Sequence, residues 1–199
     1  MSSENSNRPV RIAGQTPSEW TAATRAVFDT TVSTTRQRPL HLPSVIAHHQ
    51  AWIGPYIEWA KAVALEGLLE PRATALLALR CAHNCRSGFE WGVHTERAVT
   101  SGALSDDEIV RVAAGPDASG WTDSDAALLQ AADDLHAGST IGADAWSVLA
   151  VHHGQDELVE ICLTVGHYTM LSMMANTAGV PSEAHWAGLD EAPPRPAAG

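Results

Sequence analysis

The chain has 199 residues, of which 45% are hydrophobic and 18% charged, a composition that allows a packed core and excludes an intrinsically disordered protein. Its formal net charge is −11 and its twelve Lys and Arg residues are scattered, so we expect neither nucleic acid nor a membrane surface as a partner. The N-terminus lacks the apolar core of a signal peptide. We also expect no uncharged apolar stretch of the roughly 18–20 residues that span a bilayer, which together predicts a cytoplasmic protein.

We expect one domain over residues 16–190. The segments 1–15 and 191–199 are polar or rich in Pro and Ala, and we expect them to be flexible ends.

The first half of the domain predicts three helices. Thr16-Pro17-Ser18-Glu19 combines an N-cap residue, a Pro at the first helical position and an acid three residues after the cap, which predicts a helix over 17–34. Two Pro residues predict a loop over 36–43. Apolar residues with a 3.6-residue period predict a helix over 53–65, and Pro71 begins an apolar helix that reaches Arg80.

The second half continues with helices. Ser87 and Glu90 have capping-box spacing and predict a helix over 87–100 that ends at Gly102. Ser105 and Glu108 form a second such pattern, which predicts a short helix ending near Gly115. Further helices are predicted over 122–136, 143–152 and 156–178. No segment alternates apolar and polar residues as a strand does, so the sequence predicts an all-α protein.

Chemically active side chains gather between Arg80 and His94. Glu90 and His94 are four residues apart, which places them on one face of a helix. A carboxylate can orient an imidazole and raise its basicity, so this pair suits general acid/base catalysis. Two structural alternatives stay open: Glu90 could complete the capping box with Ser87, and His94 could be an ordinary core or surface histidine.

The same pair has the spacing of metal ligands. A stable site needs a third ligand, which the sequence does not locate, and the HExxH pattern is absent because Phe89 occupies its first position. We therefore predict no metal site. No phosphate-binding loop or dinucleotide fingerprint occurs either, and we predict that the protein uses no cofactor.

Other residues could bind a substrate. Ser87 lies at a predicted helix N-terminus, where backbone N–H groups favour an anion, although it could serve only as a cap. Arg80 could hold the same anionic group. The remaining candidates are aromatic or histidine side chains, for which packing is the alternative role: His83, Trp91, His167 and Tyr168.

Three cysteines, Cys81, Cys85 and Cys162, argue against a disulfide framework. None of them forms a CxxC motif. Buried apolar thiols are the simplest interpretation, with Cys81 and Cys85 kept as an alternative reactive pair.

Several motifs together resemble carboxymuconolactone decarboxylase and alkylhydroperoxidase D-like proteins. The resemblance covers most of residues 47–180. Its first part consists of Pro71-Arg72, Leu76-Leu77-Ala78-Leu79-Arg80, Phe89-Glu90-Trp91 with His94, and Gly102-Ala103-Leu104-Ser105-Asp106-Asp107-Glu108-Ile109. Its second part consists of Ala131-Ala132-Asp133-Asp134-Leu135 and the helix from Tyr168 to Val180.

The resemblance implies an all-helical bundle that assembles into trimers or hexamers. It also implies either cofactor-free decarboxylation of a small lactone acid or reduction of peroxides by a CxxC dithiol. Carried over by position, the dithiol falls on Ser87 and Glu90, the family histidine on His94 and an upstream glutamate on Ala75. Both thiols and that glutamate are therefore missing here.

Three functions stay open from the sequence. The favoured one is a cofactor-independent acid/base enzyme of lyase, isomerase or cyclase type, in which His94 and Glu90 act on a small carboxylated or oxygenated molecule. The second is a thiol peroxidase that uses Cys81 and Cys85, and the third is a non-catalytic binding or assembly protein. Helices that are apolar around most of their circumference predict a homo-oligomer.

Overall fold

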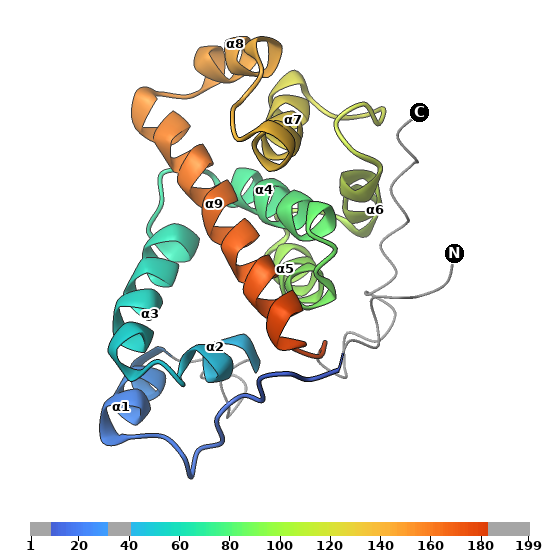
Figure 1. The fold of residues 1–199 in the computed structure, drawn as a ribbon. Coiled ribbons are helices and arrows are strands. Elements are labelled where there is room, and N and C mark those ends of the chain that lie inside the picture. The colour runs from blue at the N-terminus through green and yellow to red at the C-terminus, as the bar shows by residue number, and fades with distance from the viewer. Residues whose placement is uncertain (1–8, 32–40, 183–199) are drawn as a thin grey trace.

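The computed structural model describes residues 9–31 and 41–182, and every regular element in these two ranges is an α-helix (Figure 1). The helices are α1 (Ala22–Thr31), α2 (His41–Ile46), α3 (Gln50–Leu65), α4 (Pro71–Asn84), α5 (Gly88–Ser101), α6 (Asp106–Ala114), α7 (Asp123–Gly138), α8 (Ala143–His152) and α9 (Gln155–Ala178). The all-α prediction is confirmed for this part of the chain.

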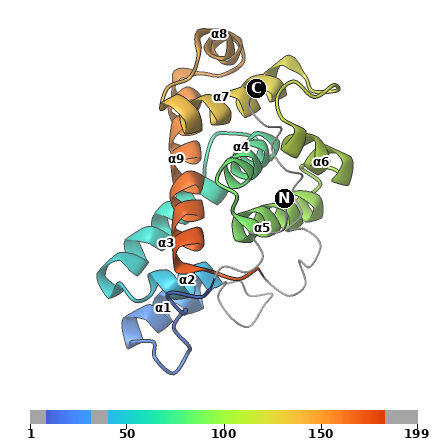
Figure 2. The ribbon, with the colours of Figure 1, turned by 45° about the vertical axis from the view of Figure 1, so that its right-hand side comes forward.

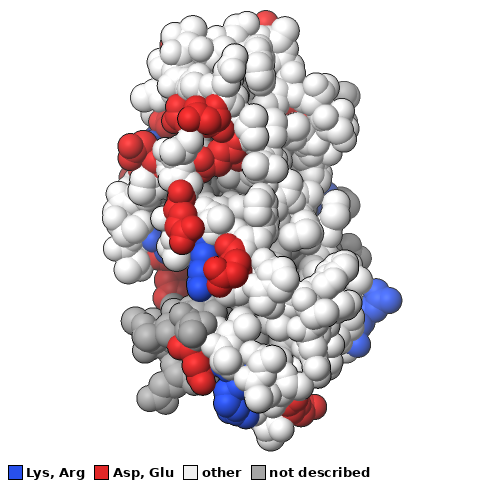
Figure 3. Space-filling view, turned by 90° about the vertical axis from the view of Figure 1, so that its left-hand side faces the viewer, with Lys and Arg blue, Asp and Glu red and all other residues white. Residues whose placement is uncertain are grey.

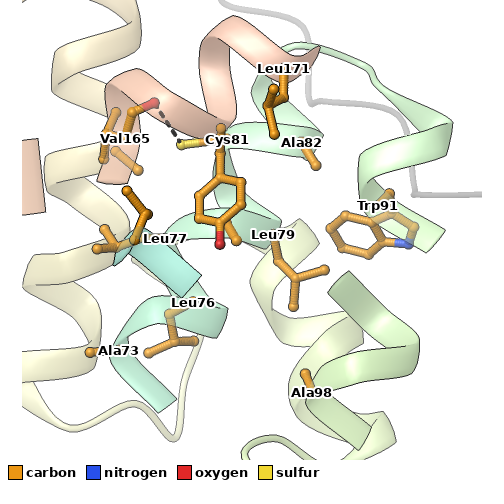
Figure 4. Close-up of a cluster of buried hydrophobic side chains, with 14 of the residues drawn as sticks. Ala73, Leu76, Leu77, Leu79, Cys81, Ala82, Trp91, Ala98, Val165 and Leu171 are labelled. Carbon is orange, nitrogen blue, oxygen red and sulfur yellow. Dashed lines mark hydrogen bonds between the residues drawn. The ribbon is translucent and has the colours of Figure 1, made fainter. Parts of the chain in front are cut away.

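Helices α4 and α9 organise the core. Helix α4 packs against α5, α7 and α9, and α9 also packs against α3 and α5. Figure 2 shows α9 lying between α3 on one side and the pair α4 and α5 on the other. In Figure 4, Leu77 and Ala82 of α4 face Val165 and Leu171 of α9. Burial of such side chains is the main stabilising contribution to the fold.

Helix ends follow the predicted signals in most places. Ser105 and Glu108 form a complete capping box at the start of α6, and Gly102 ends α5 with a φ of 72°. Thr122 caps α7 by accepting a hydrogen bond from the backbone N–H of Asp125.

The predictions for the first 46 residues are partly wrong. Thr16 and Glu19 do bond to each other, but 17–19 is a turn, and α1 begins only at Ala22 behind a second cap, Thr21. The predicted end of this helix, 32–34, lies outside the described residues. The predicted loop over 36–43 has its first part outside them as well, and its last residues begin helix α2, which contains Pro43.

The chain ends are described only in part. We predicted that residues 9–15 are flexible. In the structure this segment contacts the end of α9, where the backbone N–H groups of Arg11 and Ile12 both donate to the carbonyl of Ala178. Residues 1–8 and 183–199 lie outside the described residues.

Helix α9 corrects one expectation from the sequence. By length and composition, Gln155–Ala178 could cross a membrane, whereas we expected no such segment. Half of its most apolar window is buried inside the structure, and the core helix of a soluble protein meets the same criteria of length and composition.

Candidate functional site

The predicted acid/base pair lies on the first two turns of α5. Ser87 is the N-cap residue, and its Oγ accepts a hydrogen bond from the backbone N–H of Glu90 at 3.4 Å. Gly102 ends the helix in the left-handed conformation that glycine adopts without steric cost. The four-residue spacing then places Glu90 and His94 together on the buried face of the helix.

Glu90 and His94 contact each other inside the protein. Oε2 of Glu90 lies 3.3 Å from Nε2 of His94, and the two residues are 3% and 8% exposed. A carboxylate withdrawn from water is costly unless it is paired. In the part of the chain that the structure describes, the His94 imidazole lies close enough to form an ion pair with this carboxylate when the ring is protonated. The pair can therefore hold and pass a proton, which is what general acid/base catalysis requires.

The alternative role of Glu90, completing a capping box, is not what the structure shows. In α6 the Glu108 carboxylate accepts a hydrogen bond from the backbone N–H of Ser105 at 2.9 Å. In α5 the N–H of Ser87 instead donates to the carbonyl of Ala82 at 2.9 Å. Because of this backbone bond, the Glu90 carboxylate is free to contact His94, one turn further along the same helix.

One ring of α9 lies against the pair, and a second ring of the same helix lies against the first. The Tyr168 ring meets the His94 ring edge-on, with centroids 4.5 Å apart and an angle of 78°. The rings of His167 and Tyr168 are 5.0 Å apart. Both residues were predicted substrate-binding candidates, and the structure brings both of them to the acid/base pair.

His167 has its protonation fixed by a neighbour on α3. The indole N–H of Trp59 donates to Nδ1 of His167 at 3.0 Å. An indole can only donate, so Nδ1 must be an acceptor, and the neutral ring then carries its proton on Nε2. Burial, together with the nearby His94, lowers the pKa of His167 to about 4. His167 is thus an uncharged hydrogen-bond donor at neutral pH.

Two phenols complete this cluster. Burial raises the pKa of Tyr168 and of Tyr56 well above the usual value. The positive charge of Arg97 partly opposes this rise at Tyr168, and the negative charge of Glu90 adds to it at both phenols. Both phenols therefore stay protonated at neutral pH. The Tyr168 hydroxyl is buried and has no hydrogen-bond partner among the described residues.

The structure gives Arg80 a different role from the predicted one. Its guanidinium donates to both carboxylate oxygens of Asp133, at 2.6 and 2.7 Å, and to the carbonyls of Val112 and Ala113. The residue is 5% exposed. A guanidinium engaged in this way joins α4 to α6 and α7, so we correct its assignment from substrate binding to structure.

The remaining predicted substrate-binding residues are buried around Arg80 and the start of α5. Nδ1 of His83 lies 3.4 Å from Nη1 of Arg80, and the rings of His83 and Trp91 are 6.1 Å apart. Ser87 is 2% exposed and serves as the helix cap. Of these contacts, only the cap bond from the backbone N–H of Glu90 to Ser87 joins this group to the acid/base pair, and it involves the Glu90 backbone, not its carboxylate.

The thiols are poorly suited to nucleophilic chemistry. Cys81 is 1% exposed, its Sγ lies 3.7 Å from the Val165 carbonyl (Figure 4), and burial raises its pKa to about 12. Burial also raises the pKa of Cys85, whose Sγ lies 3.9 Å from Nδ1 of His136. Reactive thiols require the opposite, a lowered pKa and access to solvent.

Two further features lie away from the cluster. A surface hollow of about 560 Å³ at the end of α9 is lined by Pro9, Arg11, Asn176 and Thr177, none of which was predicted as a site residue. Within the described ranges, no three His, Cys, Asp or Glu side chains group as metal ligands would.

Sequence reasoning missed the contribution of α3. Tyr56 and Trp59 are more than 100 residues from His167 along the chain, and the spacing between them matches no catalytic or ligand-binding motif. The large number of Trp residues was the only available signal, and it indicated packing.

Comparison with known proteins gives a similarity of fold. No family model and no curated protein matches the sequence. Among solved structures, the chain is similar to a protein of unknown function from Agrobacterium tumefaciens, a candidate antioxidant defence protein of the AhpD type. The TM-score is 0.61 and the identity 22%, over 65% of this chain and 89% of that one. The AhpD-like helical fold predicted from the sequence motifs is thereby supported.

Proposed function

We propose that this protein is a cofactor-independent acid/base enzyme that acts on a small carboxylated or oxygenated organic molecule. The observation that carries the proposal is the buried contact between Glu90 and His94. Its AhpD-like fold supports a place in the group that contains carboxymuconolactone decarboxylases and alkylhydroperoxidases.

In this proposal His94 moves the proton and Glu90 orients the imidazole or takes up the proton in turn. Proton transfer without a redox partner corresponds to lyase, isomerase or cyclase chemistry. Burial strengthens the case, because an acid/base pair withdrawn from water acts on its substrate without competition from solvent.

A thiol peroxidase is the weaker alternative. It would need one thiolate to attack the peroxide and a second thiol to resolve the product. The raised pKa values of Cys81 and Cys85 oppose the first step.

A non-catalytic role is also less favoured. A solvent-exposed Glu90–His94 pair would have favoured that role. The residues concerned are almost fully buried.

The test is incorporation of solvent deuterium into a panel of small keto acids and unsaturated lactones, followed by proton NMR in D₂O. We expect wild-type protein to accelerate exchange in at least one of them and His94→Gln to abolish the acceleration. His153→Gln is the matched control, because His153 pairs with Glu157 at the same spacing, 3.4 Å apart, outside the cluster. Equal rates for wild-type protein and His94→Gln would contradict the proposal.

We further propose that the chain forms a homo-oligomer through α3 and α9. Figure 3 shows a broad surface without charged side chains beside a group of acidic ones. Large apolar side chains are exposed along one side of α9 and on α3: Val159 (58%), Leu163 (46%), Met170 (43%), Met173 (59%) and Trp52 (67%). Exposed apolar patches of this kind commonly mark association surfaces.

Sedimentation velocity tests this second proposal. We expect wild-type protein to sediment as an oligomer and Leu163→Glu to sediment as a smaller species. Val110→Glu is the control, because Val110 is 64% exposed but lies on α6. A monomeric wild-type protein would contradict the proposal.

A further inference from the structure

We infer that Tyr168 and His167 donate hydrogen bonds to a carbonyl oxygen of the substrate, and that the substrate belongs to the carbonyl compounds that form an enolate. The inference rests on the acid/base function proposed above and names a substrate class for it. The two side chains would stabilise the negative charge that develops on the oxygen during proton transfer.

The first observation is the unpartnered hydroxyl of Tyr168. The residue is 2% exposed, and its hydroxyl oxygen has no hydrogen-bond partner in the described part of the protein. It is one of six buried side-chain atoms without a partner in the described ranges, and the one whose ring lies against His94. Native proteins satisfy nearly all buried polar groups, so such an atom calls for an explanation, for example a bound molecule or a catalytic role. Because the phenol stays protonated, the natural missing partner is an acceptor.

The second observation is the fixed tautomer of His167. Since Trp59 donates to Nδ1, the proton of the neutral ring lies on Nε2 and is available for donation. Burial keeps this imidazole uncharged across the physiological range. A neutral imidazole that donates from a buried position is one of the known means of polarising a carbonyl.

The third observation is the proximity of both donors to the acid/base pair. Tyr168 packs edge-on against His94, and His167 packs against Tyr168. A positively charged donor at this place would form an ion pair with the Glu90 carboxylate, and Glu90 could then no longer act together with His94 as the base. Uncharged donors stabilise an oxyanion and leave the Glu90–His94 pair intact, so the choice of residue types fits proton transfer beside a carbonyl.

The chemical step follows from this arrangement. The Glu90–His94 pair takes a proton from the carbon next to the substrate carbonyl, and the electrons of that C–H bond form a C=C bond. The carbonyl π electrons move to the oxygen, which accepts hydrogen bonds from Tyr168 and His167. Return of the proton to the same or to a conjugated carbon regenerates the carbonyl, and no oxidant or reductant is consumed.

Binding of 4-nitrophenol tests the donors directly, because its phenolate resembles an enolate and has its own visible absorbance. We expect wild-type protein to bind it as the phenolate, and Tyr168→Phe to bind it roughly ten- to a hundredfold more weakly, the usual effect of losing one hydrogen bond to a charged group. His153→Gln should bind as wild type does. Absence of phenolate binding to wild-type protein, or equal affinity for Tyr168→Phe, would overturn the inference.

Nitrogen-15 NMR of the histidine side chains tests the role of Trp59. In wild-type protein His167 should show an unprotonated Nδ1 and a protonated Nε2, and Trp59→Phe should make the two tautomers mix. Trp59 is 39% exposed, so this substitution should leave the fold intact. A protonated Nδ1 in wild-type protein would overturn the assignment of His167 as an Nε2 donor.

The same binding assay separates this inference from the proposed function. In His94→Gln, deuterium exchange should be lost while phenolate binding that depends on Tyr168 remains. If the wild-type protein catalyses exchange but Tyr168→Phe binds the phenolate as tightly as wild type does, only the assignment of the donors is overturned. Phenolate binding without any exchange would count against the acid/base function alone.

Discussion

Replacing Tyr168 by Phe removes one oxygen atom from the contact between α5 and α9 and should make the protein more stable. A buried donor without a partner costs roughly 1–3 kcal/mol, and the Tyr168 hydroxyl is such a donor. The ring itself stays, together with its contacts to His94 and His167 at 4.5 and 5.0 Å. Allowing for the small void that the oxygen leaves, we expect a gain of about 1 kcal/mol in the free energy of unfolding.

Urea unfolding followed by circular dichroism measures this gain. The midpoint should rise while the slope with urea stays unchanged, since the substitution alters no other surface. In a chain of this length, 1 kcal/mol corresponds to a rise in Tm of about 2–4 °C. A loss of 1 kcal/mol or more would refute the reasoning, because it would mean that the hydroxyl has a structural partner in the folded protein.

Three further predictions concern stability and reactivity. Asp133→Ala should lower the free energy of unfolding by about 3–5 kcal/mol, because it leaves the buried Arg80 guanidinium without its counter-charge; a loss below 1 kcal/mol in chemical denaturation would contradict the assigned role. The folded-state pKa of His167 lies near 4 and its ordinary value is 6.5, so the unfolded chain takes up this proton first as the pH falls. Stability present above pH 6.5 should therefore be lost between pH 6.5 and 4, by at most about 3 kcal/mol, and His167→Gln should flatten this part of the stability curve. Finally, a thiol reagent should modify the exposed Cys162 in the native protein and the buried Cys81 only after unfolding, and equal rates would contradict the burial described here.

The helices of the C-terminal half could be predicted well because their signals are local. Ser105, Gly102 and Thr122 act within one helical turn of their own position, and α8 has the bounds predicted from the sequence. The short helix α2 was missed because Pro43, which lies inside it, was taken as a sign of a loop.

The same Ser-x-x-Glu pattern occurs at Ser87 and at Ser105, yet it leads to different hydrogen bonds, which a local pattern could not predict. Both serines cap a helix, but only Glu108 completes the box. The difference arises because the Ser87 N–H finds the Ala82 carbonyl in the turn between α4 and α5, a contact set by how those two helices meet.

Contacts between distant segments explain what the sequence could not provide. Arg80 was assigned to a substrate because its partner Asp133 lies 53 residues away. Trp59 was not assigned at all, since its bond to His167 joins α3 to α9 across 108 residues. Glu90 and His94 could be predicted because both lie on one helix, four residues apart.

The most direct test of the central claim measures the initial rate of deuterium incorporation next to the carbonyl of the best substrate in the keto acid and lactone panel. The rate is compared between wild-type protein, Glu90→Gln and Glu157→Gln. Glu157 is the appropriate control because it contacts a histidine at the same spacing outside the cluster. Loss of exchange in Glu90→Gln, with the wild-type rate kept in Glu157→Gln, is the predicted result. Exchange that persists unchanged in Glu90→Gln would show that the buried pair is structural and would contradict the account.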